Sequence, residues 1–380
     1  MKIEEVNLLE ELMKYERDWN QLYRESLDTN FYLNFYWVVN WWKYFGKNYK
    51  MHCFFIYEEE NNKMVMILPL MGNEIRYGIH KVEQMKFIGE DLLDIGGCIS
   101  RDLKLNVIDI LEFIFQKYPL CCIRLFNIPR NEWKKYKNTN ISCFMITNEE
   151  AILWLRLKQD WKEQLSSCTS GLRYDIKKGF KLIEEKGLEI KVYNNTFSCE
   201  KQMEEIDLQS HKVNRKENFF ISTERKEWIA SLLHDVSCDK DLGAVVAFIY
   251  DNEKPIAYAL AWIFKDRAYF YQTSFNQKYG YLNPGHVLIS ILIQECQNQG
   301  IKYFLMGRGL STYKYKWTKE EEIYRTYTFY HSNFVGNAIY HYVKIVEHIR
   351  KCFLIYYGHV SEKRIDKLLL KKIWIKLRNE

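Results

Sequence analysis

The sequence is poor in proline and glycine for its length, with 5 Pro and 17 Gly among 380 residues. This composition excludes a collagen-like chain and a long disordered linker, because both are rich in these residues. The sequence also lacks low-complexity segments and repeats of solenoid length. Aromatic residues are instead abundant, at 16%, which indicates large cores filled with aromatic side chains.

Long hydrophobic runs are missing as well. The longest apolar runs, such as residues 353–357, are too short to cross a bilayer. No hydrophobic segment stands at the N-terminus, and the ten cysteines show no paired spacing typical of a metal site. We therefore expect a cytoplasmic protein with reduced, buried thiols and no metal.

The positive charge of the sequence is concentrated at its end. Residues 335–380 contain ten Lys or Arg and four Asp or Glu, an excess equal to the net charge of +6 for the whole chain. A nucleic-acid-binding protein usually carries basic charge across its binding domain. No nucleic-acid partner is therefore expected.

The length of the chain predicts two domains. A boundary near residues 148–160 divides the sequence into domains at 1–150 and 151–334, followed by a helical tail at 335–380. The first half mixes helices and strands, which predicts an α/β fold with mixed (α+β) sheets. Its expected elements are a helix capped by Asn7 and running to Ser26, a helix at 35–45, a hairpin at 51–71, strands near 82–88 and 92–99, a helix at 101–118, a strand at 121–126 and a helix that begins at Pro129.

The second half contains three β-rich runs, at 242–250, 254–264 and 267–275, separated by very short turns. Turns this short predict an antiparallel meander. A helix from Pro284 to Gln299 and a strand at 301–306 then form a parallel strand–helix–strand unit. Ligands commonly bind at the carboxyl ends of such strands.

Upstream of the meander, Ser170 can cap a helix that Gly187 ends, and this helix carries Arg173, Lys177 and Lys178. Two further helices are expected at 197–213 and 223–236.

Two loops follow the strand ends of this unit. The first, residues 276–286, leads to the N-terminus of the helix that Pro284 opens, where free N–H groups favour phosphate binding. The second reads Gly-Arg-Gly at 307–309, and glycines after a buried strand let a ligand approach the backbone. The alternatives are an ordinary helix start and a surface turn.

The second half resembles the FemAB/CelD-type branch of the GNAT acyltransferase superfamily. The shared residues are Lys254-Pro255-Ile256-Ala257, Asn283-Pro284-Gly285, and Gly307-Arg308-Gly309 through Tyr313-Lys314 to Trp317; in the first half they are Trp37, Trp41-Trp42, Phe87-Ile88-Gly89 and Asp94-Ile95-Gly96. The resemblance implies two tandem GNAT-like domains, with acetyl-CoA or another acyl-CoA bound in the second. The Gln-x-x-Gly of the family's phosphate loop is present at 277–280, whereas Tyr281-Leu282 departs from its second half.

The resemblance also implies roles for individual residues. The cofactor-binding residues would be Tyr271, Thr273, Ser274, Gln277, Lys278, Gly280, Pro284, Gly285 and His286. The acceptor would be bound by Arg173, Arg308, Lys314 and Trp317.

Backbone N–H groups of residues 271–274 would polarise the thioester carbonyl. Tyr313 is the candidate acid for the leaving thiolate, and His211 is the candidate base. The alternatives are that Tyr313 packs on Trp317, that His211 is structural, and that Arg173 belongs to a solvated helix face.

Three functions follow from this interpretation. The first is an acyl-CoA-dependent N-acyltransferase, in particular an acetyltransferase, that acts on an amino-sugar or similar cell-envelope or polysaccharide precursor, either a small molecule or lipid-linked. The second is a FemAB-like transferase that uses aminoacyl-tRNA and a peptidoglycan precursor; the absence of a long helical hairpin and of a broadly basic groove in the sequence argues against it. The third is a non-catalytic binding protein with a GNAT fold.

The end of the tail has its own pattern. Residues 364–377 place apolar side chains at helical spacing among Lys and Arg, which predicts a basic amphipathic helix. Such a helix can lie on an anionic membrane at its inner face, or it can dock its apolar side on its own domain.

Overall fold

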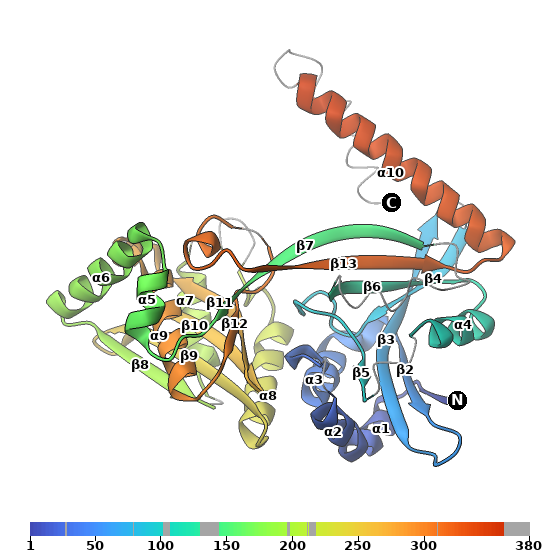
Figure 1. The fold of residues 1–380 in the computed structure, drawn as a ribbon, viewed down its shortest axis with the longest axis horizontal. Coiled ribbons are helices and arrows are strands. Elements are labelled where there is room, and N and C mark those ends of the chain that lie inside the picture. The colour runs from blue at the N-terminus through green and yellow to red at the C-terminus, as the bar shows by residue number, and fades with distance from the viewer. Residues whose placement is uncertain are drawn as a thin grey trace.

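A computed structural model describes residues 1–26, 29–78, 80–101, 107–129, 144–195, 198–210, 212, 218–309 and 311–360. Figure 1 shows two lobes that share one sheet, because the long strands β7 (Phe144–Arg156) and β13 (Glu321–Tyr330) run between them. The strand order is β1-β2-β3-β4-β6-β13-β7-β12-β11-β10-β9-β8, with β5 beside β3. The predicted mixed α/β class is confirmed.

The first lobe contains most of the predicted elements, preceded by a strand, β1, that was not predicted. Its elements are β1 (Lys2–Val6), α1 (Leu9–Leu12), α2 (Glu16–Glu25), α3 (Phe35–Phe45), β2 (Lys50–Tyr57), β3 (Met64–Tyr77), β4 (His80–Phe87), β5 (Ile99–Ser100), α4 (Val107–Lys117) and β6 (Cys121–Pro129), with 3-10 turns at Met13–Tyr15, Phe31–Leu33 and Gly46–Asn48. Strands β2, β3 and β4 form an antiparallel meander, and β6 returns parallel to β4.

Three expectations for this lobe were wrong. Asn7 does not cap the first helix, because α1 begins after Leu8 without a side-chain cap and a 3-10 turn separates it from α2. Residues 92–98 form no strand, since Gly89 and Gly97 have positive φ and turn the chain. Pro129 is not a first helical residue, because it ends β6 opposite Tyr324, at a strand end where a missing N–H costs little; residues 130–143 lie outside the described part of the chain.

The second lobe repeats the meander and the parallel return. Its elements are α5 (Trp161–Ser167), α6 (Ser170–Glu185), β8 (Glu189–Asn194), α7 (Glu200–Leu208), α8 (Thr223–Cys238), β9 (Leu242–Asp251), β10 (Lys254–Phe264), β11 (Arg267–Phe275), α9 (Pro284–Asn298) and β12 (Tyr303–Leu305), with 3-10 turns at Gln277–Leu282 and Lys314–Lys316. Strands β9, β10 and β11 are antiparallel, and β12 pairs parallel with β11, as predicted.

The helix α6 is capped by a residue other than the one expected. The Thr169 side chain accepts a hydrogen bond from the N–H of Leu172, so Ser170 is the first helical residue. Gly187 follows the end of the helix with φ of 64°, as its predicted role requires.

Each lobe completes its sheet with a long strand. Strand β13 pairs with β6 of the first lobe, and β7 pairs with both β13 and β12. The chain therefore returns to the first lobe after the second lobe is built. The domain limits at residues 150 and 334 stay a prediction.

Aromatic rings hold the two lobes together. Phe31 stacks on Trp262 with ring centroids 4.9 Å apart, and Tyr23 stacks on Phe264 at 4.3 Å. All four rings are buried. Each such ring pair stabilises the fold by about 0.5–1.5 kcal/mol beyond the burial of its surface. These contacts therefore hold the two lobes in one relative position.

The tail begins as a single helix, α10 (Phe334–Val360). Its main contacts are with β13 and β3, and Figure 1 shows the rest of the helix running out from the body. The predicted amphipathic helix at 364–377 lies outside the described residues. Among the residues that are described, no helix combines the length and the apolar character needed to span a membrane.

Candidate functional site

The two parallel strands of the second lobe separate along their length. Strand β11 pairs with β12 only from Arg267 to Tyr269, and β12 ends at Leu305. On its other edge β11 carries a bulge, because Phe270 and Gln272 pair with consecutive residues of β10 and Tyr271 lies between them. A bulge bends its strand and increases the local twist. The edge of β11 from Phe270 to Phe275 is thereby opened beside the shorter strand.

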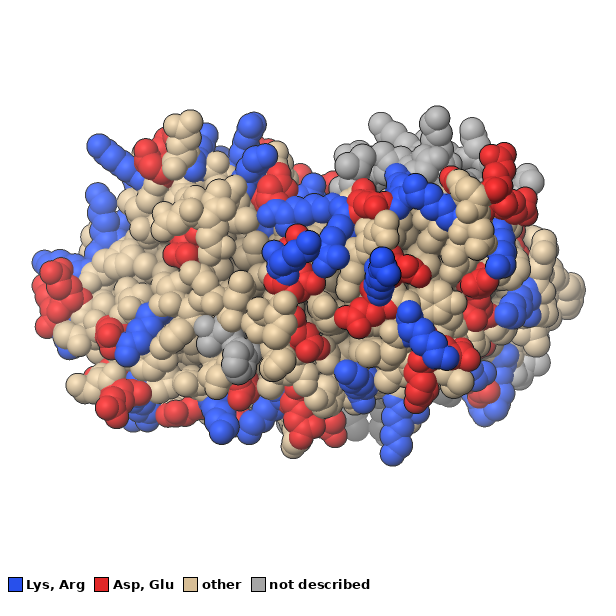
Figure 2. Space-filling model, turned by 90° about the horizontal axis from the view of Figure 1, so that it is seen from below, with Lys and Arg blue, Asp and Glu red and all other residues tan. Residues whose placement is uncertain are grey.

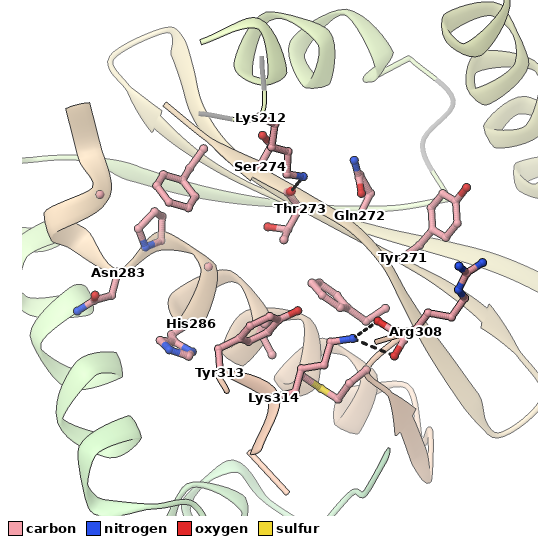
Figure 3. A pocket seen from close by; sticks show the side chains of 18 of the residues that line it. Lys212, Tyr271, Gln272, Thr273, Ser274, Asn283, His286, Arg308, Tyr313 and Lys314 are labelled. Carbon is pink, nitrogen blue, oxygen red and sulfur yellow. Dashed lines mark hydrogen bonds between the residues drawn. The ribbon is translucent and has the colours of Figure 1, made fainter. Parts of the chain in front are cut away.

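This opening leads into a cavity of about 600 Å³. Most of its wall comes from β11, from the start of α9 and from the segment after β12, and Figure 3 shows their side chains converging on it. The lining residues are Asp94, Lys212, Phe270, Tyr271, Gln272, Thr273, Ser274, Phe275, Gly280, Asn283, Pro284, Gly285, His286, Ile289, Met306, Gly307, Arg308, Tyr313 and Lys314.

The N-terminus of α9 forms one end of the cavity. Asn283 precedes it in the left-handed conformation, with φ of 52°, and makes no side-chain cap. Pro284 and Gly285 occupy the first turn, and a Cβ added to Gly285 would meet no atom within 4 Å. The first N–H groups of a helix lack partners within it and attract anions. This end of the cavity therefore suits a phosphate group.

A buried lysine holds the opposite rim in place. The Nζ of Lys314 donates to the carbonyls of Gly307, Arg308 and Gly309, at 2.6 to 3.0 Å. Lys314 is only 5% exposed, and its burial lowers the pKa of the ammonium to about 8. Three donors are thus used on three consecutive carbonyls, which fixes the Gly-Arg-Gly turn as one wall of the cavity.

The first lobe contributes Asp94 to this wall. The Tyr32 hydroxyl donates to Asp94 Oδ2 at 2.7 Å, and a Cβ at Gly307 would lie 3.3 Å from the same oxygen. Burial raises the pKa of the Asp94 carboxyl, although Tyr32 and the charges of Arg308 and Lys314 oppose the shift. A carboxylate with a raised pKa at the edge of a cavity is suited to accept a proton.

Sequence reasoning included Asp94 only as part of a family motif and gave it no role in the site. Nothing in the sequence near residue 94 indicates that it meets residue 307. The Asp94-Ile95-Gly96 motif was the only available signal.

Tyr313 projects into the cavity from the segment after β12. Its hydroxyl points toward the cavity centre, with His286 on one side and Lys314 on the other (Figure 3). Burial raises the pKa of Tyr313 to about 12, so the phenol keeps its proton at neutral pH. The centroid of the His286 ring lies 6.3 Å from that of the Tyr313 ring. Burial lowers the pKa of His286, so its imidazole is neutral at neutral pH.

Two further groups line the middle of the cavity. Lys212 reaches β11 from the segment after α7 and donates to the carbonyl of Thr273 at 2.6 Å (Figure 3). Ser274 is 2% exposed, and its hydroxyl is buried without a hydrogen-bond partner. A buried hydroxyl without a partner is costly. The Ser274 hydroxyl is therefore available to a polar ligand.

Arg308 lies at the rim with its guanidinium turned toward the first lobe. Its Cζ lies 4.9 Å from the Phe126 ring centroid, its Nη1 donates to Leu93 O at 3.4 Å, and its Nε lies 3.5 Å from Glu150 Oε2. These contacts tie the Gly-Arg-Gly turn to the loop that carries Asp94.

The structure brings most of the predicted site residues together. Ten of them line the cavity: Tyr271, Thr273, Ser274, Gly280, Pro284, Gly285, His286, Arg308, Tyr313 and Lys314. His211 lies outside the described residues.

Four predicted residues lie away from the cavity wall. Gln277 and Lys278 are exposed on a 3-10 turn that the Asn276 side chain fixes by accepting from Lys278 N. Arg173 donates to the carbonyls of Ser166 and Cys168. Trp317 is 3% exposed, in the core of the second lobe.

The comparisons with known proteins concern this same region. Residues 170–315 match the family described as an acetyltransferase (GNAT) domain. This range holds α6, the meander, α9, β12 and every cavity residue except Asp94. No curated protein matches the sequence.

Several solved structures share the fold of most of the chain. FemX aligns with a TM-score of 0.59 at 8% identity, covering 86% of this chain and 97% of its own. L-PGS from Bacillus licheniformis aligns at 0.50, with 13% identity and coverage of 85% and 94%. A conserved protein of unknown function from Bacteroides thetaiotaomicron VPI-5482 aligns at 0.52, with 12% identity and coverage of 86% and 100%. At such identities the likeness establishes the fold alone.

Proposed function

We propose that this protein is an acyl-CoA-dependent N-acyltransferase, since residues 170–315 match the family described as an acetyltransferase (GNAT) domain. The single observation that supports this function best is the opening between β11 and β12. It exposes the edge of β11 beside the N-terminus of α9. A thioester and a diphosphate need these two features at the two ends of one cavity.

The residues present fit an acyl-CoA. The first turn of α9, with open space at Gly285, suits the diphosphate. The Ser274 hydroxyl and the opened edge of β11 suit the amide and thioester groups, because both offer hydrogen bonds that the protein leaves unused or exposed. When bound, the cofactor supplies a thioester carbonyl that an amine can attack.

The reaction needs a base and an acid. As the amine nitrogen bonds to the carbonyl carbon, the Asp94 carboxylate accepts the proton that the nitrogen loses. As the carbon–sulfur bond breaks, the Tyr313 phenol donates its proton to the departing sulfur, and solvent restores both groups. The raised pKa of Asp94 suits the base, because it makes the carboxylate a better proton acceptor. Tyr313, with its pKa raised by burial to about 12, is fully protonated at neutral pH and so has a proton to donate.

The acceptor would enter from the side of the first lobe. Asp94, Tyr32 and Arg308 lie together there, bridging the two lobes. We propose an amino-sugar or a similar cell-envelope or polysaccharide precursor as the acceptor, because the sequence resembles the FemAB/CelD-type branch and because the base comes from the first lobe. The donor proposed is acetyl-CoA.

Binding is tested by thermal unfolding with acetyl-CoA, longer acyl-CoAs and desulfo-CoA. A ligand at a hundred times its Kd stabilises the folded state by about 2.7 kcal/mol, so we expect a clear rise in Tm with at least one of them. Release of free thiol in the presence of a panel of amino-sugars then reports turnover. The absence of a Tm shift with every CoA species would contradict the proposal.

An aminoacyl-tRNA-dependent transferase is the second function to test in the same experiment. Transfer of a labelled amino acid from aminoacyl-tRNA to a peptidoglycan precursor, without any effect of CoA, would favour it. The face of the molecule in Figure 2 carries Lys and Arg interspersed with Asp and Glu rather than a continuous basic surface. A nucleic-acid donor generally requires a continuous basic surface, and this face does not supply one.

A further inference from the structure

A second cavity, of about 380 Å³, lies where β7 and β13 leave the second lobe (Figure 1). Ile152 and Leu305 are among the residues that line it. Their neighbours Leu153 and Phe304 pack in the core that contains α9. Because successive residues of a strand point to opposite faces, this second cavity lies on the face of the sheet opposite α9.

Four strands form the floor of the second cavity. Its lining includes directly paired residues of β11 and β12, of β12 and β7, and of β7 and β13: Arg267 with Tyr303, Leu305 with Trp154, and Ile152 with Glu322. Directly paired residues point to the same face of a sheet. The positions of these side chains are therefore set by hydrogen-bonded strands rather than by a loop.

Two aromatic rings on this floor are partly exposed. The ring centroids of Trp154 and Tyr303 lie 5.8 Å apart, with an angle of 66° between the planes. Tyr269 follows Arg267 on the same face of β11 but is only 2% exposed. Phe31 and Tyr32 of the first lobe lie against it, with ring centroids 6.3 and 5.8 Å away. The first lobe thus covers Tyr269 and leaves the two rings of the floor open to a ligand.

Charged groups of opposite sign stand at the two edges of the second cavity. Glu322 accepts a hydrogen bond from the hydroxyl of Tyr324, which is 4% exposed, so the carboxylate is held at 2.9 Å from a fixed donor. Glu321 adds a second carboxylate at this edge, and Arg267 is exposed at the other. Within the described part of the chain, neither Glu322 nor Arg267 makes an ion pair. Both charges can therefore attract charged groups of a ligand.

The two charges are well separated. Strands β12 and β7 lie between β11, which carries Arg267, and β13, which carries Glu322. Three strand spacings amount to about 14 Å between the two backbones, and the side chains span only part of this distance. A ligand that meets both charges must therefore hold its own charged groups several bonds apart. The volume lies within the range of about 300–1,000 Å³ that is typical of small-molecule sites.

We propose that the second cavity binds an ω-amino acid, a molecule with an ammonium group at one end, a carboxylate at the other and an apolar chain between them. The ammonium would contact Glu322, the carboxylate would contact Arg267, and the chain would lie on the rings of Trp154 and Tyr303. This inference is independent of the proposed reaction, because the two cavities share no lining residue.

Calorimetric titration of the full chain tests the proposal with four probes: ε-aminocaproate, hexanoate, hexylamine and glycine. We expect ε-aminocaproate to bind at least tenfold more tightly than hexanoate or hexylamine, because only it meets both charges. Glycine should bind most weakly, since its two charges are adjacent. Saturation with desulfo-CoA should leave the Kd for ε-aminocaproate unchanged. No binding of ε-aminocaproate at millimolar concentrations, or its displacement by desulfo-CoA, would overturn the proposal.

Two variants assign each charge to its end of the ligand. Glu322→Gln should reduce the affinity for ε-aminocaproate to that for hexanoate, and Arg267→Gln should reduce it to that for hexylamine. Arg267→Lys keeps the charge and should bind within a few-fold of the parent. Glu253→Gln and Lys254→Gln are the matched controls, because both residues are exposed at the turn between β9 and β10.

The probes with one charge show whether a variant acts through the charge that it removes. Hexanoate should bind Glu322→Gln as it binds the parent, and hexylamine should bind Arg267→Gln as it binds the parent. Thermal unfolding confirms that each variant is folded. Equal weakening of all probes by either variant, or unchanged binding of ε-aminocaproate by both, would overturn the proposal.

Discussion

The two lobes contain the same series of elements, a three-stranded meander followed by a parallel strand. They differ in how that parallel strand, β6 or β12, pairs with the meander. In the first lobe β4 pairs with β6 from Glu83 to Lys86, close to the end of β4. In the second lobe β11 pairs with β12 over its first three residues and is open from Phe270 onward. The first lobe is therefore closed at this strand pair, whereas the second lobe opens there onto the cavity of the candidate site.

The loop after the last meander strand accounts for the difference. In the first lobe the loop at 88–98 folds back onto the sheet, and Gly96 lies so close to Phe126 O that a Cβ there would be 2.1 Å away. In the second lobe the chain turns outward in a 3-10 turn and begins α9 at Pro284. The closed lobe uses its returning loop to place Asp94 in the cavity of the open lobe.

The largest effect is expected from the residue that links the two lobes chemically. Asp94→Asn removes the proposed base, so kcat/KM should fall by roughly 10²–10⁴-fold, while the Kd for desulfo-CoA stays unchanged. Steady-state kinetics and calorimetry measure the two quantities. Asp91→Asn is the control, since Asp91 lies on the same loop and accepts from Trp41 Nε1 at 2.9 Å. Equal activity of Asp94→Asn and the parent would remove Asp94 from the mechanism.

Substitutions at two glycines should have different effects: Gly96 is packed within the closed lobe, whereas Gly307 lines the cavity. Gly96→Ala should destabilise the protein by roughly 1–3 kcal/mol through overpacking, with any residual folded protein still binding CoA. Gly307 has φ of 72°, and its Cβ would lie 2.9 Å from Phe270 O. Gly307→Ala should therefore weaken CoA binding as well as stability.

Urea unfolding and calorimetry check both glycine variants. Gly309→Ala is the control for backbone strain alone, because Gly309 also has positive φ but a Cβ there meets no atom within 4 Å. The comparison between the lobes would be weakened if Gly96→Ala, rather than Gly307→Ala, abolished CoA binding in folded protein.

Tyr313→Phe should have a smaller effect. Loss of the proposed acid should lower kcat about tenfold or more and leave KM for acyl-CoA nearly unchanged, because the ring still lines the cavity. Tyr315→Phe is the matched control, since Tyr315 is exposed and its hydroxyl donates to Glu321. An unchanged kcat in Tyr313→Phe would show that the leaving sulfur takes its proton from another group.

A pH effect on stability is expected from the closed lobe. His52 is buried between Glu5 of β1, at 2.6 Å, and Glu83 of β4, at 3.3 Å. Burial of His52 disfavours its charged form, but these two carboxylates together outweigh that effect and raise the pKa of His52. Its stabilising charge is therefore fully present below the unfolded pKa of about 6.5 and is lost as pH rises through the folded pKa.

The two carboxylates act in the opposite direction. Their pKa values are lowered by His52 and, for Glu5, also by Lys117 and Tyr118. Their contribution is present above the unfolded pKa of about 4.3 and is lost as pH falls through the folded values. The cluster should therefore stabilise the lobe most between about pH 5 and 6.5.

Urea unfolding of His52→Gln measures this effect. The parent should lose about 1–2 kcal/mol more than the variant between pH 6 and pH 8.5. His80→Gln is the control, because His80 is exposed. Parallel pH curves for the parent and His52→Gln would contradict the assignment.

The sequence predicts the second lobe better than the first. Turns of two residues between β9, β10 and β11 permit only a meander, and the Pro284 helix permits only a crossover to a parallel strand. In the first lobe Gly96 and Gly97 were included in the strand expected at 92–99, because the close approach of Gly96 to Phe126 and of Gly97 to Leu33 is not revealed by any local pattern.

The site residues divide in the same way, into those that a local pattern predicts and those that depend on how the lobes pack. The rim residues Gly307, Arg308, Tyr313 and Lys314 follow a strand end, so their grouping is visible in the sequence. Asp94 is more than 200 residues from them, and its role depends on how the lobes pack. Trp317 and Arg173 were misplaced because an indole and a guanidinium near a loop can serve the core or a helix end equally well.

The central claim is that the opened lobe, at the N-terminus of α9, binds CoA. Calorimetric titration of desulfo-CoA into the parent, Gly285→Phe and Gly171→Phe tests it directly, because both glycines have open space around them but only Gly285 lines the cavity. We predict one site of equal Kd in the parent and Gly171→Phe, and binding at least a hundredfold weaker in Gly285→Phe. Equal binding by all three proteins, or no binding by the parent, would contradict the account.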